Sequence, residues 1–236
     1  VLGPLMHEFG WAEDDYDKLA QGSLAGHVIE CGAQCTGGNF TDWRDVPDFH
    51  NMGFPIAECF DDGHFIITKP DNTGGLVTTA TVGEQIVYEI GDPRAYMLPD
   101  VVCDFTRVQL EQVGDNRVSV SGAKGLPPTD SYKVSATYPD GNRITASFLM
   151  GGIDAPQKGQ VVADAILKKV DGLFKQLGMA PMRETSVEIL GSEATYGAQA
   201  RRSDTRAVVV KIGALHDDKK ALGLFAREIA QAATGM

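Results

Sequence analysis

Apolar positions in the first half of the chain change repeatedly between helical and strand spacing. Asp61-Asp62-Gly63 and Gly114-Asp115-Asn116 are turn sequences of the kind that join antiparallel strands. Gly22 and Gly26 weaken the first helical pattern, so two short helices are an alternative there. The predicted elements are helices over 14–34 and 77–90, and strands over 55–60, 64–68, 101–105, 108–113 and 117–121.

The second half of the chain has a more regular pattern. Gly122–Asp130, with Gly125 and two prolines, predicts a linker, which gives domains over 1–125 and 130–236. Helices on one face of a mainly antiparallel sheet are the economical packing for the residues after this linker, so we predict an α+β sandwich with β-β-α-β-β-α order. Its elements are strands over 132–138 and 143–150 around the turn Pro139-Asp140-Gly141-Asn142, a helix over 157–177 with an apolar face from Val161 to Leu177, strands over 185–190 and 206–214, and a helix over 217–233.

Composition narrows the class of protein. The 236 residues are 43% hydrophobic and 22% charged, as in ordinary soluble globular proteins. A net charge of -11 repels nucleic acids and anionic membranes, so we expect neither as a partner. The sequence has no apolar run of ~20 residues and no signal peptide. Four cysteines are too few for a disulfide framework, which favours the cytoplasm or, in a eukaryote, the mitochondrial matrix.

The segment Ala25–Trp43 holds most of the candidate chemistry. If the first helix continues through it, His27, Glu30, Cys31 and Cys35 share one helix face at i, i+3, i+4 and i+8. A metal site, a His27–Glu30 acid–base pair and ordinary packing are the three interpretations. The metal site is the least favoured, because no C-x₂-C spacing occurs, and no metal or cofactor is predicted. His7 is a further candidate base, or a packed histidine.

Two Thr-Gly-Gly tripeptides form the second candidate site. Thr73-Gly74-Gly75 precedes a predicted helix, so its N–H groups could hold a phosphate or carboxylate, with Lys69 adding a positive charge. Thr36-Gly37-Gly38 is the other copy, and ordinary turns explain both equally simply. No P-loop, G-x-G-x-x-G or G-x-S-x-G motif is present. The nearby polar side chains that could bind a substrate are Asn39, Thr41 and Asp42.

Several long motifs carry a family resemblance. The motifs are LGPLMHEFGW (2–11), AGHVIECGAQCTGGNFTDW (25–43), GFPIAE (53–58), ITKPDNTGGLVTTATVGEQIVYEIGDPRAYMLPDV (67–101) and LEQVGDNRVSVSGAKG (110–125). They resemble the acyclic terpene utilisation (AtuA-like) family. The resemblance implies that 1–125 is an α/β segment, the remainder of a larger Rossmann-like region, and that the chain is the central segment of a longer protein. The first residues of the chain agree with this expectation of a longer protein, since the chain starts Val1-Leu2-Gly3-Pro4 without Met.

The resemblance also implies a metabolic role. Family members are linked to catabolism of branched terpenoids such as citronellol and geraniol, as CoA thioesters beside a geranyl-CoA carboxylase. We therefore expect a homo-oligomer that binds a small-molecule carboxylate or acyl-CoA, with a hydratase- or lyase-type step at His27 and Glu30. The alternative is a non-catalytic subunit that assembles with the carboxylase or with itself. A nucleotide-binding module would depend on a region that this chain lacks.

Overall fold

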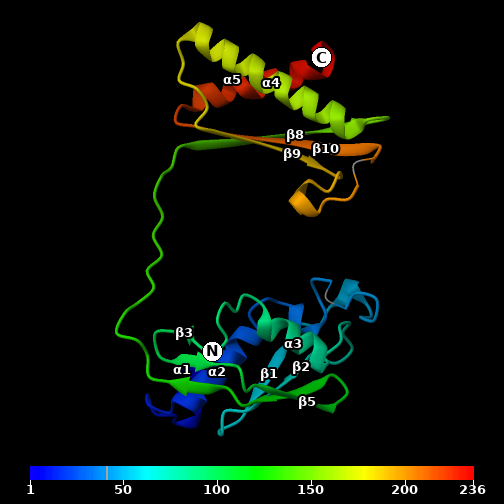
Figure 1. The fold of residues 1–236 in the computed structure, drawn as a ribbon. Coiled ribbons are helices and arrows are strands. Elements are labelled where there is room, and N and C mark those ends of the chain that lie inside the picture. Colours follow the sequence, from blue (N-terminus) through cyan, green and yellow to red (C-terminus); the bar gives the residue numbers. More distant parts are fainter. Residues whose placement is uncertain (41, 203) are drawn as a thin grey trace. The chain divides into compact units, whose positions relative to one another are not determined.

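A computed structural model describes residues 1–40, 42–202 and 204–236. The chain divides into two compact units, Val1–Val134 and Ser135–Met236, and each has its own hydrophobic core. Helices are combined with three antiparallel sheets, so the fold is mixed α/β (Figure 1). Within the part of the chain that is described, no helix is both long and apolar enough to cross a bilayer.

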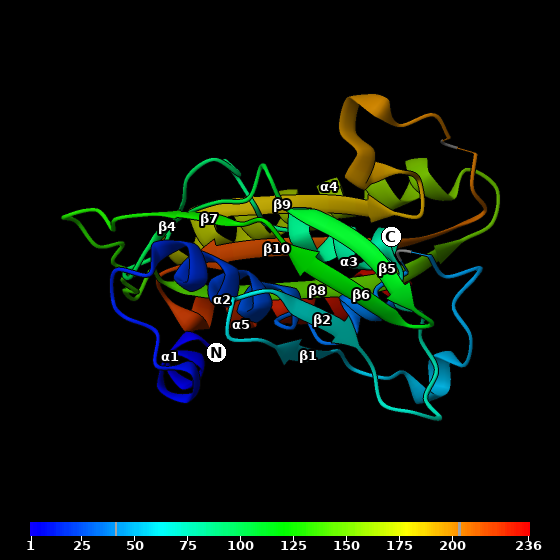
Figure 2. The same ribbon diagram turned by 90° about the horizontal axis from the view of Figure 1, so that it is seen from below.

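The first unit contains two antiparallel sheets. The larger has the order β1-β2-β6-β5 (Figure 2) and the smaller the order β3-β4-β7. Short turns join β1 to β2 and β5 to β6, too short for the crossovers that a parallel, Rossmann-like sheet needs. The expected Rossmann-like character is therefore not seen in the described residues of this unit. The strands are β1 (Ile56–Cys59), β2 (Phe65–Thr68), β3 (Tyr96–Met97), β4 (Val102–Asp104), β5 (Gln109–Gly114), β6 (Arg117–Ser121) and β7 (Lys124–Leu126).

These strands confirm the hairpins that the sequence predicts. Ile56 pairs with Thr68 and Cys59 with Phe65 across the Asp61-Asp62-Gly63 turn. Asn116 takes a left-handed φ of 53° in the β5–β6 turn, a conformation that asparagine tolerates well. β7 was not predicted, and it lies inside the expected linker.

The helix α2 (Tyr16–Val28) of the first unit buries one face against the larger sheet. Leu19 and Leu24 of α2 are fully buried in one cluster with Phe65 of β2 and Val118 of β6. The Gln21 side chain ties the same helix to the sheet, because its amide donates to the Val120 carbonyl (2.8 Å). The helices are α1 (Leu2–Phe9), α2 (Tyr16–Val28), α3 (Thr79–Val87) and the short 3₁₀ helices η1 (Gln34–Thr36) and η2 (Phe49–Asn51).

α2 ends six residues earlier than the sequence predicts, and this corrects the proposed helical face. The helix stops at Val28, and Gly32 then adopts a left-handed φ of 55°. Near the end of α2 the His27 carbonyl accepts a hydrogen bond from the Gln85 side chain (3.0 Å), which satisfies a terminal helix carbonyl. Glu30, Cys31 and Cys35 therefore do not continue the helix, and the common face with His27 does not form.

The second unit is a three-stranded antiparallel sheet with both of its long helices on one face (Figure 1). The strand order is β8-β10-β9, so β10 is central and β8 and β9 are the edges. Ile166 and Phe174 of α4 pack with Ile212 of β10 and Phe225 of α5. The elements are β8 (Asn142–Gly151), α4 (Ala155–Leu177), β9 (Glu184–Leu190), η3 (Ala194–Gln199), β10 (Ala207–His216) and α5 (Lys219–Gly235).

Two predictions for this unit are wrong. The strand expected over Tyr132–Tyr138 is not formed, and the observed order is β-α-β-β-α. That segment lies within 127–141, where the chain is exposed and takes part in no strand pairing among the described residues. Val161 and Leu177, expected on the apolar face of α4, are 67% and 63% exposed. The buried face runs through Gly159, Ala163, Ile166, Val170 and Phe174, so Val161 points to the other side of the helix and Leu177 lies beyond the last buried residue.

Candidate functional site

His27 is held at the end of α2 by the backbone of α3. Its Nε2 lies 2.9 Å from the Gln85 carbonyl oxygen, and its ring centroid lies 6.0 Å from that of Tyr96. A carbonyl can only accept a hydrogen bond, so Nε2 carries the proton in this contact. In the neutral ring Nδ1 is then the nitrogen that can accept a proton.

His27 lines a pocket of about 500 Å³ in the first unit. The structure brings His27 and Glu30 to the same pocket, although not on one helix face. The lining combines apolar side chains with three carboxylates. The lining residues are Val1, Leu2, Gly22, Ser23, Gly26, His27, Glu30, Glu89, Tyr96, Leu98, Pro99 and Asp100. A pocket of this size is suited to a small organic ligand.

The charge of this pocket determines which part of a ligand it suits. Glu30, Glu89 and Asp100 all carry carboxylates, and His27 is the one basic side chain among its lining residues. Phosphate groups are therefore disfavoured here, whereas a neutral branched chain can contact Leu2.

The cysteines near the pocket separate into two environments. The Cys31 thiol donates to the Glu30 carboxylate (2.7 Å), and this acceptor raises the pKa of Cys31 above its ordinary value. Cys35 is fully buried, and burial raises its pKa to about 12. Across residues 1–40, 42–202 and 204–236, no group of three or more His, Cys, Asp or Glu side chains is arranged to hold a metal ion.

The two Thr-Gly-Gly tripeptides are brought together, which their separation in the sequence did not indicate. The Leu76 N–H donates to the Thr36 carbonyl (2.9 Å), which links the ends of the two tripeptides. The Gly75 N–H donates to Pro47 (3.0 Å) and the Gly74 N–H to Asn51 (2.8 Å). We call the segments 36–38, 46–53 and 73–76 the glycine cluster.

Glycine is needed in this cluster because the backbones approach closely. A Cβ on Gly74 would lie 2.3 Å from the Asp48 carbonyl oxygen, and one on Gly38 would lie 2.7 Å from that of Ala33. Gly37 has a φ of 85°, and a Cβ there would lie 2.4 Å from the Val46 side chain. The N–H groups that were expected to face an anion donate within the chain, so ligand binding by the tripeptides stays a prediction.

The remaining candidate residues are spread over the first unit. The Lys69 ammonium donates to the Thr73 carbonyl (2.7 Å) and the Asn39 side chain to that of Gln34 (3.1 Å). His7 lies exposed on α1, outside the pocket lining. Thr41 lies outside the described residues.

The glycine cluster and the His27 pocket lie near opposite ends of α3. Leu76 precedes the N-cap Thr78, whose side chain accepts from the Thr81 N–H, whereas Gln85 contacts His27 near the other end. The nine residues of α3 span about 13 Å. The structure therefore does not bring Thr36, Thr73 and their glycines to the proposed acid–base pair.

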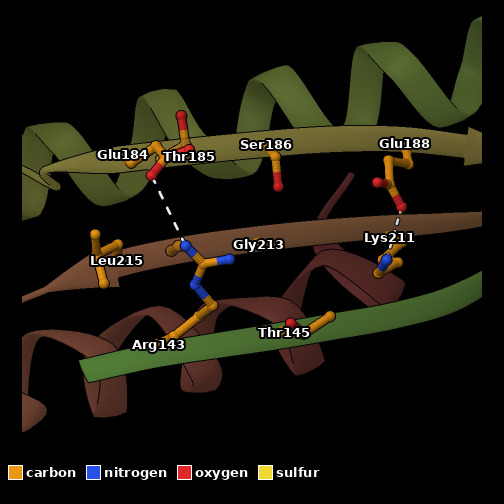
Figure 3. A pocket seen from close by; sticks show the side chains of 10 residues that line it. Arg143, Thr145, Glu184, Thr185, Ser186, Glu188, Lys211, Gly213 and Leu215 are labelled. Carbon is orange, nitrogen blue, oxygen red and sulfur yellow. Dashed lines mark hydrogen bonds and ion pairs between the residues drawn. The ribbon is translucent and has the colours of Figure 1, made fainter. Parts of the chain in front are cut away.

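The second unit has a small polar hollow that sequence reasoning missed. It has a volume of about 140 Å³ and lies on the face of the sheet opposite the helices (Figure 3). Lys211 pairs with Glu188 (2.7 Å) and Arg143 with Glu184 (3.8 Å) across it. A Cβ on Gly213 of the central strand would lie 2.6 Å from Ser186 Oγ, so glycine leaves room for that side chain. The alternation of polar and apolar residues in 143–150 was the signal that could have placed Arg143 and its neighbours on this face.

The fold and the site define a mixed α/β protein of two units with a histidine-lined pocket of small-molecule size. The family model described as "Acyclic terpene utilisation family protein AtuA" matches residues 1–236, and the chain belongs to this family. The resemblance drawn from the motifs is thereby confirmed. Family membership implies a role in acyclic terpene utilisation. Comparisons with curated proteins and with solved structures gave no match.

Proposed function

We propose that this protein performs a hydratase- or lyase-type acid–base step on a branched acyl-CoA or related carboxylate during acyclic terpene utilisation. His27 and Glu30 are the proton-transfer groups in this proposal. The single observation that carries it is the contact between His27 Nε2 and the Gln85 carbonyl (2.9 Å) at the pocket wall. This contact fixes the tautomer, as the orienting partner of a catalytic base does.

The reaction needs one base and one acid. For hydration of an α,β-unsaturated thioester, His27 Nδ1 takes a proton from water while the water oxygen bonds to the β-carbon. The C=C π electrons move onto the α-carbon and the thioester carbonyl as this bond forms. The His27 imidazolium then passes its proton to the Glu30 carboxylate, and Glu30 delivers it to the α-carbon, which restores both side chains. The sum of these steps is addition of one water, and elimination is the same sequence in reverse.

The acidic lining constrains how the substrate lies. The branched chain enters the pocket beside Leu2 and Leu98, and the anionic end stays outside because three carboxylates line the wall. In this proposal Lys69 is the cation for the anionic end. The glycine cluster packs along its side chain, since a Cβ on Gly75 would lie 3.6 Å from Lys69 Cδ.

Thermal-shift titration of the protein with geranyl-CoA tests ligand binding. A ligand at about 100 times its Kd stabilises the folded state by roughly 2.7 kcal/mol, which raises Tm by several degrees. CoA alone is the control for binding through the anionic end. Absence of any stabilisation by geranyl-CoA overturns the proposal and favours a non-catalytic assembly subunit.

Substitution of His27 separates binding from chemistry. We expect His27→Ala to lower the rate of water addition at least 100-fold, the lower end of the usual contribution of general acid–base groups, while stabilisation by ligand persists. His64→Ala is the matched control, because His64 lies in the turn between β1 and β2, outside the pocket lining and the glycine cluster. Equal activity of the two variants contradicts the assignment of His27 as the base.

A further inference from the structure

A second hollow of the first unit adjoins the His27 pocket. It has a volume of about 560 Å³, and the residues that line it all belong to the first unit. Four residues line both spaces, so the two hollows share one wall. These shared residues are Glu89, Tyr96, Leu98 and Pro99.

The second hollow is lined mainly by apolar groups. Ala95 and Met97 lie there beside the shared Leu98 and Pro99. Met97 is 68% exposed, which is unusual for methionine. A ligand that covers these side chains gains by removing apolar surface from water.

The charges around the second hollow largely offset one another. The Asp92 carboxylate already accepts two hydrogen bonds from the Arg94 guanidinium, both 3.0 Å long. Lys133 lies in the same lining as Glu89 and has the opposite charge. The second hollow therefore lacks the strongly acidic character of the His27 pocket and suits an uncharged hydrocarbon chain.

The wall between the two hollows is held by backbone pairing. Tyr96 of β3 pairs with Cys103 of β4, and the Leu98 N–H donates to the Val101 carbonyl (3.0 Å). The Tyr96 ring packs against Phe105, with 5.4 Å between the ring centroids. Because these contacts lie within the chain, the wall is formed before any ligand binds, as is usual for small-molecule sites.

The glycine cluster, the His27 pocket and the second hollow follow one another along α3. The glycine cluster adjoins the N-cap Thr78, and Gln85 near the other end of α3 contacts His27. The second hollow is lined by residues that follow the helix, from Glu89 onward. A linear ligand whose anionic end lies at the glycine cluster therefore reaches the second hollow with its other end.

We propose that the second hollow binds the distal isoprenoid end of the substrate and thereby selects its chain length. This inference rests on the proposed function, in which the anionic end lies at Lys69 and the reacting carbons lie beside His27. A chain of two isoprene units continues past Leu98 into the second hollow, whereas a chain of one unit ends in the His27 pocket. Ala95 and Met97 are the specificity-determining residues, since they line the second hollow and not the first.

Calorimetric titration of the full chain with two CoA esters tests the selection of chain length. 3-Methylbut-2-enoyl-CoA carries one isoprene unit and geranyl-CoA carries two. We expect the unmodified chain to bind geranyl-CoA at least tenfold more tightly, because five more carbons leave water.

Filling the second hollow should remove this preference. We expect Ala95→Trp to weaken binding of geranyl-CoA at least tenfold and to leave the Kd of the shorter ester within twofold. Ala12→Trp is the matched control, because Ala12 is exposed in the loop between α1 and α2, outside both linings. Unchanged binding of the shorter ester also shows that Ala95→Trp is folded.

The outcomes separate this inference from the proposed function. Equal affinity of the unmodified chain for the two esters overturns the inference and leaves the His27 site standing. A tenfold preference that persists in Ala95→Trp does the same. If neither ester binds to the unmodified chain, the inference and the proposed function both fall.

Photo-labelling of the unmodified chain locates the chain end without any substitution. A geranyl-CoA analogue with a diazirine at its terminal carbon loses N₂ on irradiation, and the carbene that remains inserts into a neighbouring bond. We expect peptide mass spectrometry to find the label within 91–99 or 129–133, and an excess of geranyl-CoA to prevent labelling there. A label found only within 1–30 overturns the inference.

Discussion

Gln85 and His27 hold each other through two hydrogen bonds of opposite sense. The Gln85 side-chain amide donates to the His27 carbonyl (3.0 Å), and His27 Nε2 donates to the Gln85 carbonyl (2.9 Å). Gln85 is fully buried and His27 is half-buried, so water competes for these bonds only from the pocket side. One residue of α3 thereby contacts both the last turn of α2 and the ring of the candidate base.

Replacing Gln85 should destabilise the first unit. We expect Gln85→Met to lower the free energy of unfolding by about 1–2 kcal/mol, because the His27 carbonyl loses its side-chain donor. The loss is moderated because Gln85 Oε1 is buried and has no hydrogen-bond partner among the described residues. Urea denaturation measures the change. Gln109→Met on exposed β5 is the control, with an expected change within ~0.5 kcal/mol, and an equal loss in both variants contradicts the role given to Gln85.

The glycine cluster should be intolerant of a methyl group. Gly74→Ala places a Cβ against the Asp48 carbonyl, and a backbone atom cannot move aside cheaply. We expect a loss of about 1–3 kcal/mol in the free energy of unfolding, as for other overpacked sites. Gly91→Ala is the control, because a Cβ there meets nothing within 4 Å. If Gly74→Ala unfolds at the same denaturant concentration as the control, close packing is not the reason for this glycine.

The cysteines should differ in the reactivity of their thiols. Burial raises the pKa of Cys35 and of Cys103 to about 12, so about one in 10⁴ of these thiols is ionised at pH 8 and neither reacts with a disulfide reagent in the folded protein. Removal of the carboxylate in Glu30→Gln lowers the pKa of Cys31 toward its ordinary value. The midpoint of Cys31 labelling therefore moves to lower pH.

The control for the Cys31 shift is Glu13→Gln. Glu13 is exposed in the loop between α1 and α2, so its charge should leave the labelling profile unchanged. A Cys31 profile that is the same with and without the Glu30 carboxylate would refute the hydrogen bond as the cause.

The Glu58–Arg117 pair should make the first unit sensitive to acid. Arg117 donates two hydrogen bonds to the Glu58 carboxylate, and they lower the pKa of Glu58 in the folded state. A lowered pKa stabilises the fold above the ordinary glutamate pKa of ~4.3, and this stabilisation is lost as the pH falls through the folded-state pKa. Both side chains are partly exposed, so screening limits the effect to about 1 kcal/mol.

Urea denaturation at a series of pH values between ~6 and ~3 measures this loss. Glu58→Gln should flatten the pH dependence in that window, whereas Glu111→Gln, on exposed β5, should keep the slope of the unaltered protein. A slope unchanged by Glu58→Gln shows that the pair does not contribute.

The parts of the fold that depend on residues close together in the sequence could be predicted. The β1–β2 hairpin follows from the Asp61-Asp62-Gly63 turn and the apolar runs on either side. α4 follows from the spacing of Ile166, Val170 and Phe174, all of which are buried. These signals lie within a few residues of the structure that they specify.

The rest depends on contacts between distant residues. The side-chain hydrogen bond near the end of α2 comes from Gln85, 58 positions from His27, and no local pattern reports that contact. The same holds for the glycine cluster, in which the Leu76 N–H bonds to the Thr36 carbonyl far away in the sequence. His27 was predicted as a site residue from its chemical type, but its tautomer depends on a backbone oxygen of another helix.

The separation of the two cores has a consequence for calorimetry. Among the residues whose burial is described, the first core lies between Trp11 and Ala123, and the second between Ala155 and Ala232. Two cores without a shared buried residue are not expected to melt as one cooperative unit. The total heat of unfolding should therefore exceed the van't Hoff value of either transition. A substitution should then change the free energy of unfolding only for the transition of the unit in which the substituted residue lies.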